Sequence, residues 1–237
     1  MTYVEGFVVP VPNANQEAYL ASARMAAPLF KEFGVIRHVE AWGADVPDGK
    51  VTDFKGSVQA TPDESVVFGW LEYPDKATRD AANRKMREDP RMKGLAMPYD
   101  GSRMIYGGFE SFVDVRAPAR GGYVEGFLVP VPEANKEAYR QLAQKAADLF
   151  REYGATRIVE AWGDDVPEGR QTDHRRAVKA EAGENVVYSW IEWPDKATRD
   201  VAWPKIMADE RMQHTGDSPF DGQRMVYGGF QPIFDSE

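Results

Sequence analysis

Six glutamates stand in the middle of strand-like segments, three in each half of the chain, and their spacing suits proton transfer. They are Glu5, Glu40, Glu72, Glu125, Glu160 and Glu192. Carboxylates that share one closed cavity lose water and repel one another, which raises some of their pKa values and favours general acid–base catalysis. The structural alternative is that they pair with Arg103, Arg224 or backbone donors, or lie near solvated strand ends. Structural ion-pair networks also shift pKa values.

Large aromatic and polar residues alternate with small ones along the same segments. Aromatic walls with a few converging polar groups are typical of a pocket for a small molecule. We therefore expect a ligand site built from Tyr3, Phe7, His38, Trp42, Trp70, Arg103, Tyr123, Phe127, Trp162, Trp190 and Arg224.

Histidine is scarce, which bears on metal and haem sites. His38 and Glu40 stand two residues apart and could begin a metal site, but the second half of the chain has Ile158 where the first has His38. The other histidines are His174 and His214. A lone strand histidine is more often structural, and a haem needs an axial ligand. We predict no metal and no cofactor.

The composition excludes several classes of partner. The formal net charge of −9 argues against nucleic acid and against an anionic membrane, which both attract basic surfaces. "YGGFESF" (106–112) weakly resembles an RNA-binding strand, but it lacks the flanking basic pattern. The absence of cysteine removes disulfides and thiol chemistry. With no signal-like start and no apolar run of roughly 20 residues, we expect a cytoplasmic protein.

The chain is a tandem repeat. A shift of 120 positions aligns residues 3–92 with 123–212 without a gap, and 52 of these 90 positions are identical. "YVEGFVVPVP" thus returns as "YVEGFLVPVP". We predict a first repeat over 1–115, a Pro- and Gly-containing linker over 116–122 and a second repeat over 123–237.

Each repeat has the pattern strand, helix, strand, strand, helix, strand. This order predicts a ferredoxin-like α+β unit, an antiparallel four-stranded sheet with both helices on one face. Two such units can cover each other sheet to sheet as an intramolecular pseudo-dimer, and further oligomerisation stays open. In the first repeat we expect strands at 3–11, 35–43, 66–73 and 103–113, and helices at 15–33 and from 76 onward.

The alternation of side chains divides the strands into two sets. We expect the aliphatic set to face the helices: Val4, Gly6, Val8, Val39, Ala41, Val67, Leu71 and Met104. We expect the aromatic and acidic set to face the other sheet: Tyr3, Glu5, Phe7, His38, Glu40, Trp42, Phe68, Trp70, Glu72, Arg103, Ile105 and Phe109. Arg37 fits the aliphatic set poorly.

Several segments resemble a known family. "VEAWGDDVP" (159–167), "PDKATRD", "MPYDGSRMIYGGF" (97–109) and "PFDGQRMVYGGF" are similar to the YbaA-like bacterial domains of unknown function (domain of unknown function 1428). The resemblance spans nearly all of both repeats and implies a dimeric α+β barrel, here as a tandem version of a homodimer. It implies no activity, and the wider class includes cofactor-free monooxygenases, isomerases and haem enzymes.

Two hypotheses about function follow. The first is a small-molecule ligand in the barrel, with acid–base or cofactor-free oxygenase or isomerase chemistry at the glutamates. The second is a non-catalytic binding or stress-related module in which the glutamates are structural. A buried, water-filled cavity of several hundred Å³ in the barrel would favour the first hypothesis, and a cavity closed by tightly packed tryptophans would favour the second.

Overall fold

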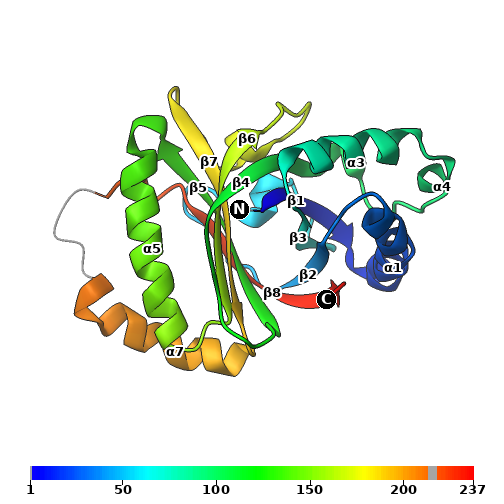
Figure 1. Cartoon of the computed structure of the whole chain (residues 1–237). Helices are drawn as coiled ribbons and strands as arrows, with labels where there is room; N and C mark the ends of the chain where they lie inside the picture. Colours follow the sequence, from blue (N-terminus) through cyan, green and yellow to red (C-terminus); the bar gives the residue numbers. More distant parts are fainter. Residues whose placement is uncertain (1, 213–217) are drawn as a thin grey trace.

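The computed structural model describes residues 2–212 and 218–237, which form two βαββαβ repeats (Figure 1). The first repeat contains β1 (Tyr3–Pro12), α1 (Gln16–Glu32), β2 (Arg37–Asp45), α2 (Phe54–Ser57), β3 (Glu64–Tyr73), α3 (Lys76–Glu88), α4 (Pro90–Lys93) and β4 (Ile105–Arg116). The second contains β5 (Tyr123–Pro132), α5 (Lys136–Glu152), β6 (Arg157–Asp165), α6 (His174–Ala177), β7 (Glu184–Trp193), α7 (Lys196–Ala208) and β8 (Val226–Asp235).

Local signals in the sequence set the ends of the main helices in both repeats. Asp75 caps α3 by accepting a hydrogen bond from the backbone N–H of Thr78 at 2.7 Å, and Asp195 caps α7 in the same way. After α1 and α5 the chain turns at Gly34 and Gly154, whose φ angles of 108° and 105° suit glycine.

The eight strands form one closed barrel in the order β1-β3-β2-β8-β5-β7-β6-β4. Within each repeat the strands pair antiparallel, and the repeats join at two seams, β2 with β8 and β4 with β6. The long helices α1, α3, α5 and α7 lie outside the barrel wall (Figure 1), whereas the short helices α2 and α6 contribute Phe54 and Ala177 to its interior. The predicted fold, two ferredoxin-like repeats closed into a pseudo-dimeric α+β barrel, is confirmed.

The predicted faces of β1 and β2 are wrong. Val4, Val8, Val39 and Ala41 lie in the interior of the barrel, whereas Tyr3, Phe7 and Trp42 pack on the helix side. Glu5, His38 and Glu40 alternate with the interior residues and also lie outside. For β3 and β4 the expectation holds at Phe68, Trp70, Ile105 and Phe109, which are interior, and at Val67 and Leu71, which face the helices. It is wrong for Arg103, which lies before β4 and binds Glu64.

The limited width of an eight-stranded barrel explains the reversal. Side chains fill the interior of such a barrel, so large residues from some strands require small ones on their neighbours. A Cβ atom on Gly6 would lie 2.7 Å from the ring of Tyr188, and one on Gly126 would lie 2.8 Å from the ring of Phe68. Each glycine of the repeated "YVEGF" therefore makes room for an aromatic ring of the other repeat.

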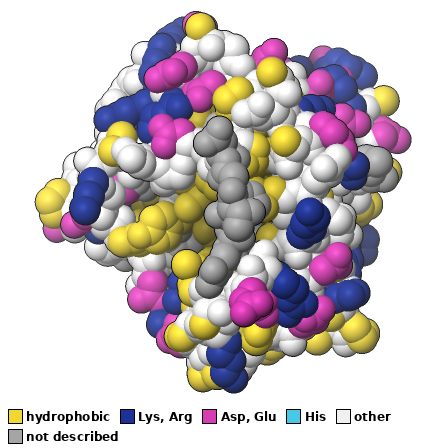
Figure 2. Space-filling model, turned by 90° about the vertical axis from the view of Figure 1, so that its left-hand side faces the viewer, with side chains coloured by type: hydrophobic (Ala, Val, Ile, Leu, Met, Phe, Trp, Pro, Cys, Tyr) yellow, Lys and Arg dark blue, Asp and Glu magenta, His cyan; other side chains and the backbone are white. Residues whose placement is uncertain are grey.

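Mixed charges cover the outside of the second repeat. Figure 2 shows the side of the molecule that carries α5 and α7, where apolar side chains gather near the centre and acidic and basic side chains surround them. Among the described residues, no helix combines the length and the apolar character that a membrane crossing requires.

Candidate functional site: a pocket beneath helix α1

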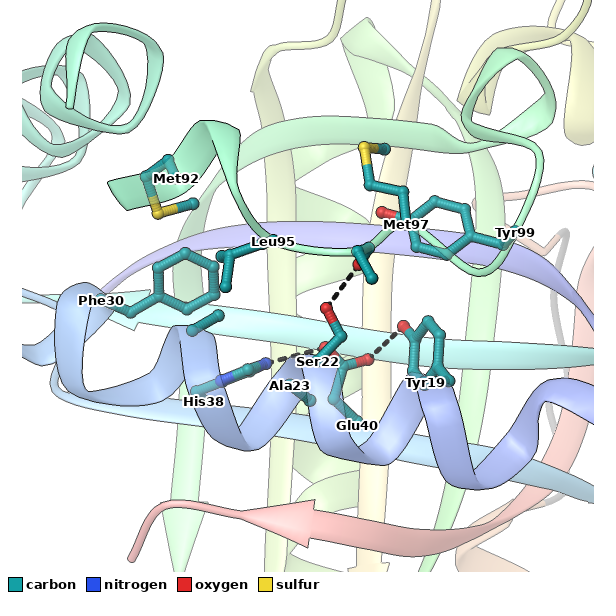
Figure 3. A pocket seen from close by; sticks show the side chains of 12 residues that line it. Tyr19, Ser22, Ala23, Phe30, His38, Glu40, Met92, Leu95, Met97 and Tyr99 are labelled. Carbon is teal, nitrogen blue, oxygen red and sulfur yellow. Dashed lines mark hydrogen bonds and ion pairs between the residues drawn. The ribbon is translucent and has the colours of Figure 1, made fainter. Parts of the chain in front are cut away.

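A pocket of about 270 Å³ lies on the outer side of the barrel wall in the first repeat. Three elements enclose it: α1, β2 and the segment after α4 that carries Leu95, Met97 and Tyr99 (Figure 3). We call it the α1 pocket. The residues that line it are Tyr19, Ser22, Ala23, Ala26, Phe30, His38, Glu40, Met92, Leu95, Ala96, Met97 and Tyr99.

Small residues on α1 leave space for this pocket, and two hydrogen bonds hold the segment after α4 in place over it. Ala23 and Ala26 face the sheet, where longer side chains would fill the space. Ser22 donates to the carbonyl oxygen of Ala96 at 2.6 Å, and the Asn15 amide donates to that of Pro98 at 2.8 Å. The segment that carries Ala96 and Pro98 is therefore bound to α1 and to the turn before it.

The polar part of the pocket centres on the buried carboxylate of Glu40. His38 Nε2 lies 2.8 Å from one of its oxygens, and the Tyr19 hydroxyl donates to the other at 2.7 Å (Figure 3). An Nε2–H that donates to Glu40 leaves Nδ1 of His38 as an acceptor. Within the described part of the chain, this Nδ1 has no hydrogen-bond partner.

Both tyrosines of the pocket remain protonated near neutral pH. Burial, together with the neighbouring Glu40 carboxylate, holds the pKa of Tyr19 well above its usual value. The same two causes raise the pKa of Tyr99 to about 12. Tyr19 is thus a hydrogen-bond donor to Glu40, and the groups that can accept a proton are His38 and Glu40.

The second repeat contributes to the position of His38. The ring of Phe234 lies 4.9 Å from the imidazole, and Phe30 packs against it at 5.2 Å. The backbone N–H of His38 donates to the Ser236 hydroxyl at 2.8 Å. The end of β8 therefore supports a site in the first repeat, across the seam between the two.

The second repeat repeats the Tyr–Glu contact without the histidine. Tyr139 donates to Glu160 at 2.9 Å, and Ile158 replaces His38. Loss of water around the carboxyl raises the pKa of Glu160 to about 7, although hydrogen bonds from Tyr139 and Ser189 oppose the rise. The matching carboxyl group of the second repeat therefore keeps the tyrosine donor but has no histidine beside it.

Two other predicted glutamates close one end of the barrel. Arg37 binds Glu192 of the other repeat at 2.8 and 3.0 Å, and Arg157 binds Glu72 at 2.6 and 2.9 Å. All four side chains are buried. This explains why Arg37 alternates with interior residues: it faces the barrel, where a carboxylate of the other repeat neutralises it.

The tryptophans continue the charge network into the barrel. Trp70 donates to Glu72 at 3.0 Å, and Trp190 donates to Glu192 at 3.0 Å. The two indole rings stack with centroids 4.4 Å apart. These residues form a packed interior and not the wall of an open pocket.

The repeated glutamate of "YVEGF" is bound to helix α3 in the first repeat and to helix α7 in the second. Glu5 accepts hydrogen bonds from Arg79 at 2.6 Å and from Asn83 at 2.8 Å. Glu125 accepts bonds from Arg199, Trp193 and Trp203. The six glutamates therefore do not share one cavity. They lie in three different environments, and each environment contains one glutamate from each repeat.

The remaining predicted residues are dispersed. Arg103 and Arg224 bind Glu64 and Glu184 on the outer side, and Arg103 lowers the pKa of Glu64 to about 2. The predicted pairing of Arg103 or Arg224 with a strand glutamate of the cluster is thus replaced by pairing with these two residues. Tyr3, Phe7, Trp42, Tyr123, Phe127 and Trp162 pack between sheet and helices. His174 is buried, and His214 lies outside the described residues.

The sequence did not single out Tyr19, Tyr99 or Leu95 as pocket residues. One signal was present: Ala23 and Ala26 lie on the buried face of α1 beside large aromatic residues, which is the pattern of a helix that leaves a cavity. Only the fold brings the segment after α4 over that face.

Comparison with known proteins agrees with this architecture. The family model described as "Protein of unknown function (DUF1428)" matches residues 2–101 and again 122–222. The uncharacterized protein YbaA of Escherichia coli (strain K12) is 63% identical over 116 residues, which cover 48% of this chain and 99% of that protein. YbaA of Shigella flexneri matches to the same extent.

Solved structures share the fold at low sequence identity. A "Putative monooxygenase" from Fusobacterium nucleatum subsp. nucleatum has a TM-score of 0.60 at 10% identity, covering 99% of this chain and 93% of that one. An "anthrone oxidase-like protein" has a TM-score of 0.50 at 13% identity, with coverages of 99% and 92%. With both repeats matched by its model, the chain belongs to the DUF1428 family.

Proposed function

We propose that the protein binds a small, partly apolar molecule in the α1 pocket and that the His38–Glu40 pair accepts a proton from it. The observation that carries the proposal is the buried Glu40 carboxylate, hydrogen-bonded to both His38 and Tyr19 in a cavity of about 270 Å³. A carboxylate that orients an imidazole in this way is a recurrent arrangement for general-base catalysis.

The lining of the pocket indicates the class of ligand. Leucine, methionine, phenylalanine and alanine side chains provide apolar contacts. The one charged group among the lining residues is the Glu40 carboxylate, which would repel an anionic molecule. A neutral, flat molecule with an acidic O–H or C–H group fits both features. Proton removal from such a molecule is a step that isomerisation and cofactor-free oxygenation share.

The interior of the barrel is a weaker candidate for the ligand. Trp70, Trp190, Phe68 and Tyr188 occupy it with stacked rings, and the Arg–Glu network closes one end. The fold neighbours named for monooxygenase or oxidase activity support small-molecule binding as a class only. We therefore place the proposed ligand outside the barrel wall.

The competing function is a non-catalytic module, and two observations favour it. The first is that Trp70 and Trp190 fill the barrel, and the second concerns the glutamates. Arginine or tryptophan donors bind Glu5, Glu72, Glu125 and Glu192, so four of the six glutamates have structural partners. This leaves only the Glu40 and Glu160 positions for proton transfer. The two functions differ in whether a molecule bound in the α1 pocket gives up a proton to the His38–Glu40 pair.

The histidine side chains provide the test. The chain has three histidines, so their nuclear magnetic resonance (NMR) signals can be assigned one by one. A panel of uncharged phenols and enolisable ketones should shift the His38 signals and leave those of His174 unchanged. Ala26→Phe should abolish the shift by filling the pocket, and Ala146→Phe at the matching position of α5 should not. An unchanged His38 spectrum, or the same response in Ala26→Phe, would overturn the proposal.

A further inference from the structure

The two seams between the repeats carry related charge clusters that are not identical. At the seam of β4 and β6, Tyr3 donates to Asp164 at 2.9 Å and Lys76 binds the same carboxylate. Arg79 binds the next residue, Asp165, at 2.5 Å. Two adjacent acids of the second repeat thus satisfy a tyrosine, a lysine and an arginine of the first.

At the seam of β2 and β8 one of these acids is replaced. Ala44 stands where the other repeat has Asp164, so a single aspartate, Asp45, remains. Asp45 accepts from Tyr123 at 2.7 Å and lies 3.2 Å from Lys196, so it takes the partners that Asp164 has in the first cluster. Among the described residues, no acid of the first repeat is paired with Arg199.

The backbone makes this a matched comparison. Each seam has a register shift at this point, so that two residues of one strand oppose one of its neighbour. The shift places residues 44 and 45 against β8, and residues 164 and 165 against β4. At the bulge itself the seams differ in one side chain, Ala44 against Asp164. Beside the arginines they also differ in Asn83 against Trp203, whose indole donates to Glu125 and packs against Arg199.

A pocket of about 480 Å³ opens beside Arg199. It is lined by residues 44–47 of the first repeat and by Arg199, Tyr227, Gly228 and Gly229 of the second. The Arg199 side chain is 29% exposed, against 5% for Arg79, and Tyr227 is 50% exposed. We call it the seam pocket, and it shares no lining residue with the α1 pocket.

We propose that the seam pocket binds a small aromatic carboxylate. Its carboxylate takes against Arg199 the place that the Asp165 carboxylate takes against Arg79, and its ring lies along the exposed ring of Tyr227. Guanidinium–carboxylate pairs give strong, directional hydrogen bonds, so the arginine selects for this group. The Arg79–Asp165 pair at the other seam thus shows the arrangement that we propose for Arg199 and the ligand carboxylate.

The local charge is compatible with an anion. The cluster at this seam contains two basic groups and three acidic groups, so its formal charge is −1. The basic groups are Arg199 and Lys196, and the acidic groups are Glu125, Asp200 and Asp45. The first cluster without Asp165 contains the matching five residues, Lys76, Arg79, Glu5, Asp80 and Asp164, with the same formal charge of −1. Asp165 nevertheless binds Arg79 there, so the charge of the cluster does not prevent a further carboxylate from binding.

The test is titration of the full chain with sodium benzoate, followed by NMR at constant ionic strength. We expect one site with a Kd of the order of millimolar, as a partly exposed ion pair and one aromatic contact provide. Benzamide has the same shape without the charge and should bind at least tenfold more weakly. Ala44→Asp, at an exposed position, supplies the missing acid and should weaken benzoate binding at least tenfold.

The reverse substitution provides a second variant. In Asp164→Ala, Asp165 should move to Tyr3 and Lys76, as Asp45 has done at the other seam, and the number of benzoate sites should rise from one to two. Equal binding of benzoate and benzamide, unchanged benzoate affinity in Ala44→Asp, or one site in Asp164→Ala would each overturn the proposal. The α1 pocket keeps all its residues in these variants, so these outcomes do not depend on the function proposed for it.

Discussion

Trp70 and Trp190 stack on each other inside the barrel with their ring centroids 4.4 Å apart and their planes inclined by 29°. Each indole donates to a glutamate that binds an arginine of the other repeat. The interior is thus one continuous packed unit from the aromatic stack to the end of the barrel. Substitutions there should affect the stability of both repeats together.

Gly6→Ala should destabilise the protein by roughly 1–3 kcal/mol, the usual cost of overpacking a core. The added methyl group would lie 2.7 Å from the Tyr188 ring, and Gly126→Ala should have a similar effect through Phe68. Gly94→Ala is the control, because its Cβ would meet nothing closer than 3.9 Å. Chemical denaturation measures all three. If Gly6→Ala were as stable as Gly94→Ala, the close packing across the repeats would be wrong.

Arg37→Met should cost roughly 3–5 kcal/mol, because it leaves the Glu192 carboxylate buried without its bidentate partner. Arg140, whose bond to Glu137 is exposed, is the comparison: Arg140→Ala should leave the free energy of unfolding nearly unchanged, because solvent screens this pair. Urea unfolding at low and high salt measures both. A cost below about 1 kcal/mol for Arg37→Met would show that the buried network does not hold the repeats together.

His174 should make stability fall as the solution is acidified. Burial lowers its pKa from 6.5 to about 4. Between these values the unfolded chain binds the proton and the folded protein does not, so the contribution is complete above pH 6.5 and is lost as the pH falls towards 4. The loss is about 3 kcal/mol. His174→Phe, which copies Phe54 of the first repeat, should remove this part of the pH dependence in denaturation curves measured from pH 4 to 7. An unchanged pH profile would exclude His174 as its source.

The fold could be predicted from the sequence, but the faces of two strands could not. The repeat, the Gly and Asp helix boundaries and the strand order are local signals, and they gave two ferredoxin-like units. Which face of β1 looks inward depends on the rings that the other repeat places opposite it, such as Tyr188 against Gly6. Gly6 has no side chain, so the segment from Tyr3 to Phe7 is compatible with either face of β1 turned inward. The position of the Tyr188 ring decides between the two.

The candidate site could be predicted only in part. His38 and Glu40 were recognised as neighbours on one face of a strand, and their hydrogen bond follows from that spacing. Tyr19 and Tyr99 were not recognised, because they come from a helix and a loop whose position depends on tertiary packing. The glutamates were expected in one cavity, whereas arginines from other elements, Arg79 and Arg157 among them, separate them.

Glu160 should have the opposite pH dependence to His174. Loss of water raises its pKa from 4.5 to about 7, so the folded protein keeps a proton that the unfolded chain releases between these values. Its contribution to stability is therefore complete below pH 4.5 and is lost as the pH rises through 7. Glu160→Gln, which cannot ionise, should be more stable than the parent by roughly 3 kcal/mol at pH 8 and nearly equal to it at pH 4.5. Ile158→His recreates the His38–Glu40 contact and should lower the pKa of Glu160, because an imidazole N–H in the position of His38 Nε2 can donate to the carboxylate. The side-chain carboxyl signal of Glu160, followed by NMR from pH 4 to 9, measures this pKa directly. A midpoint near 4.5 in the parent would show that the second repeat does not hold a neutral Glu160 carboxyl group near pH 6, and the prediction would be wrong.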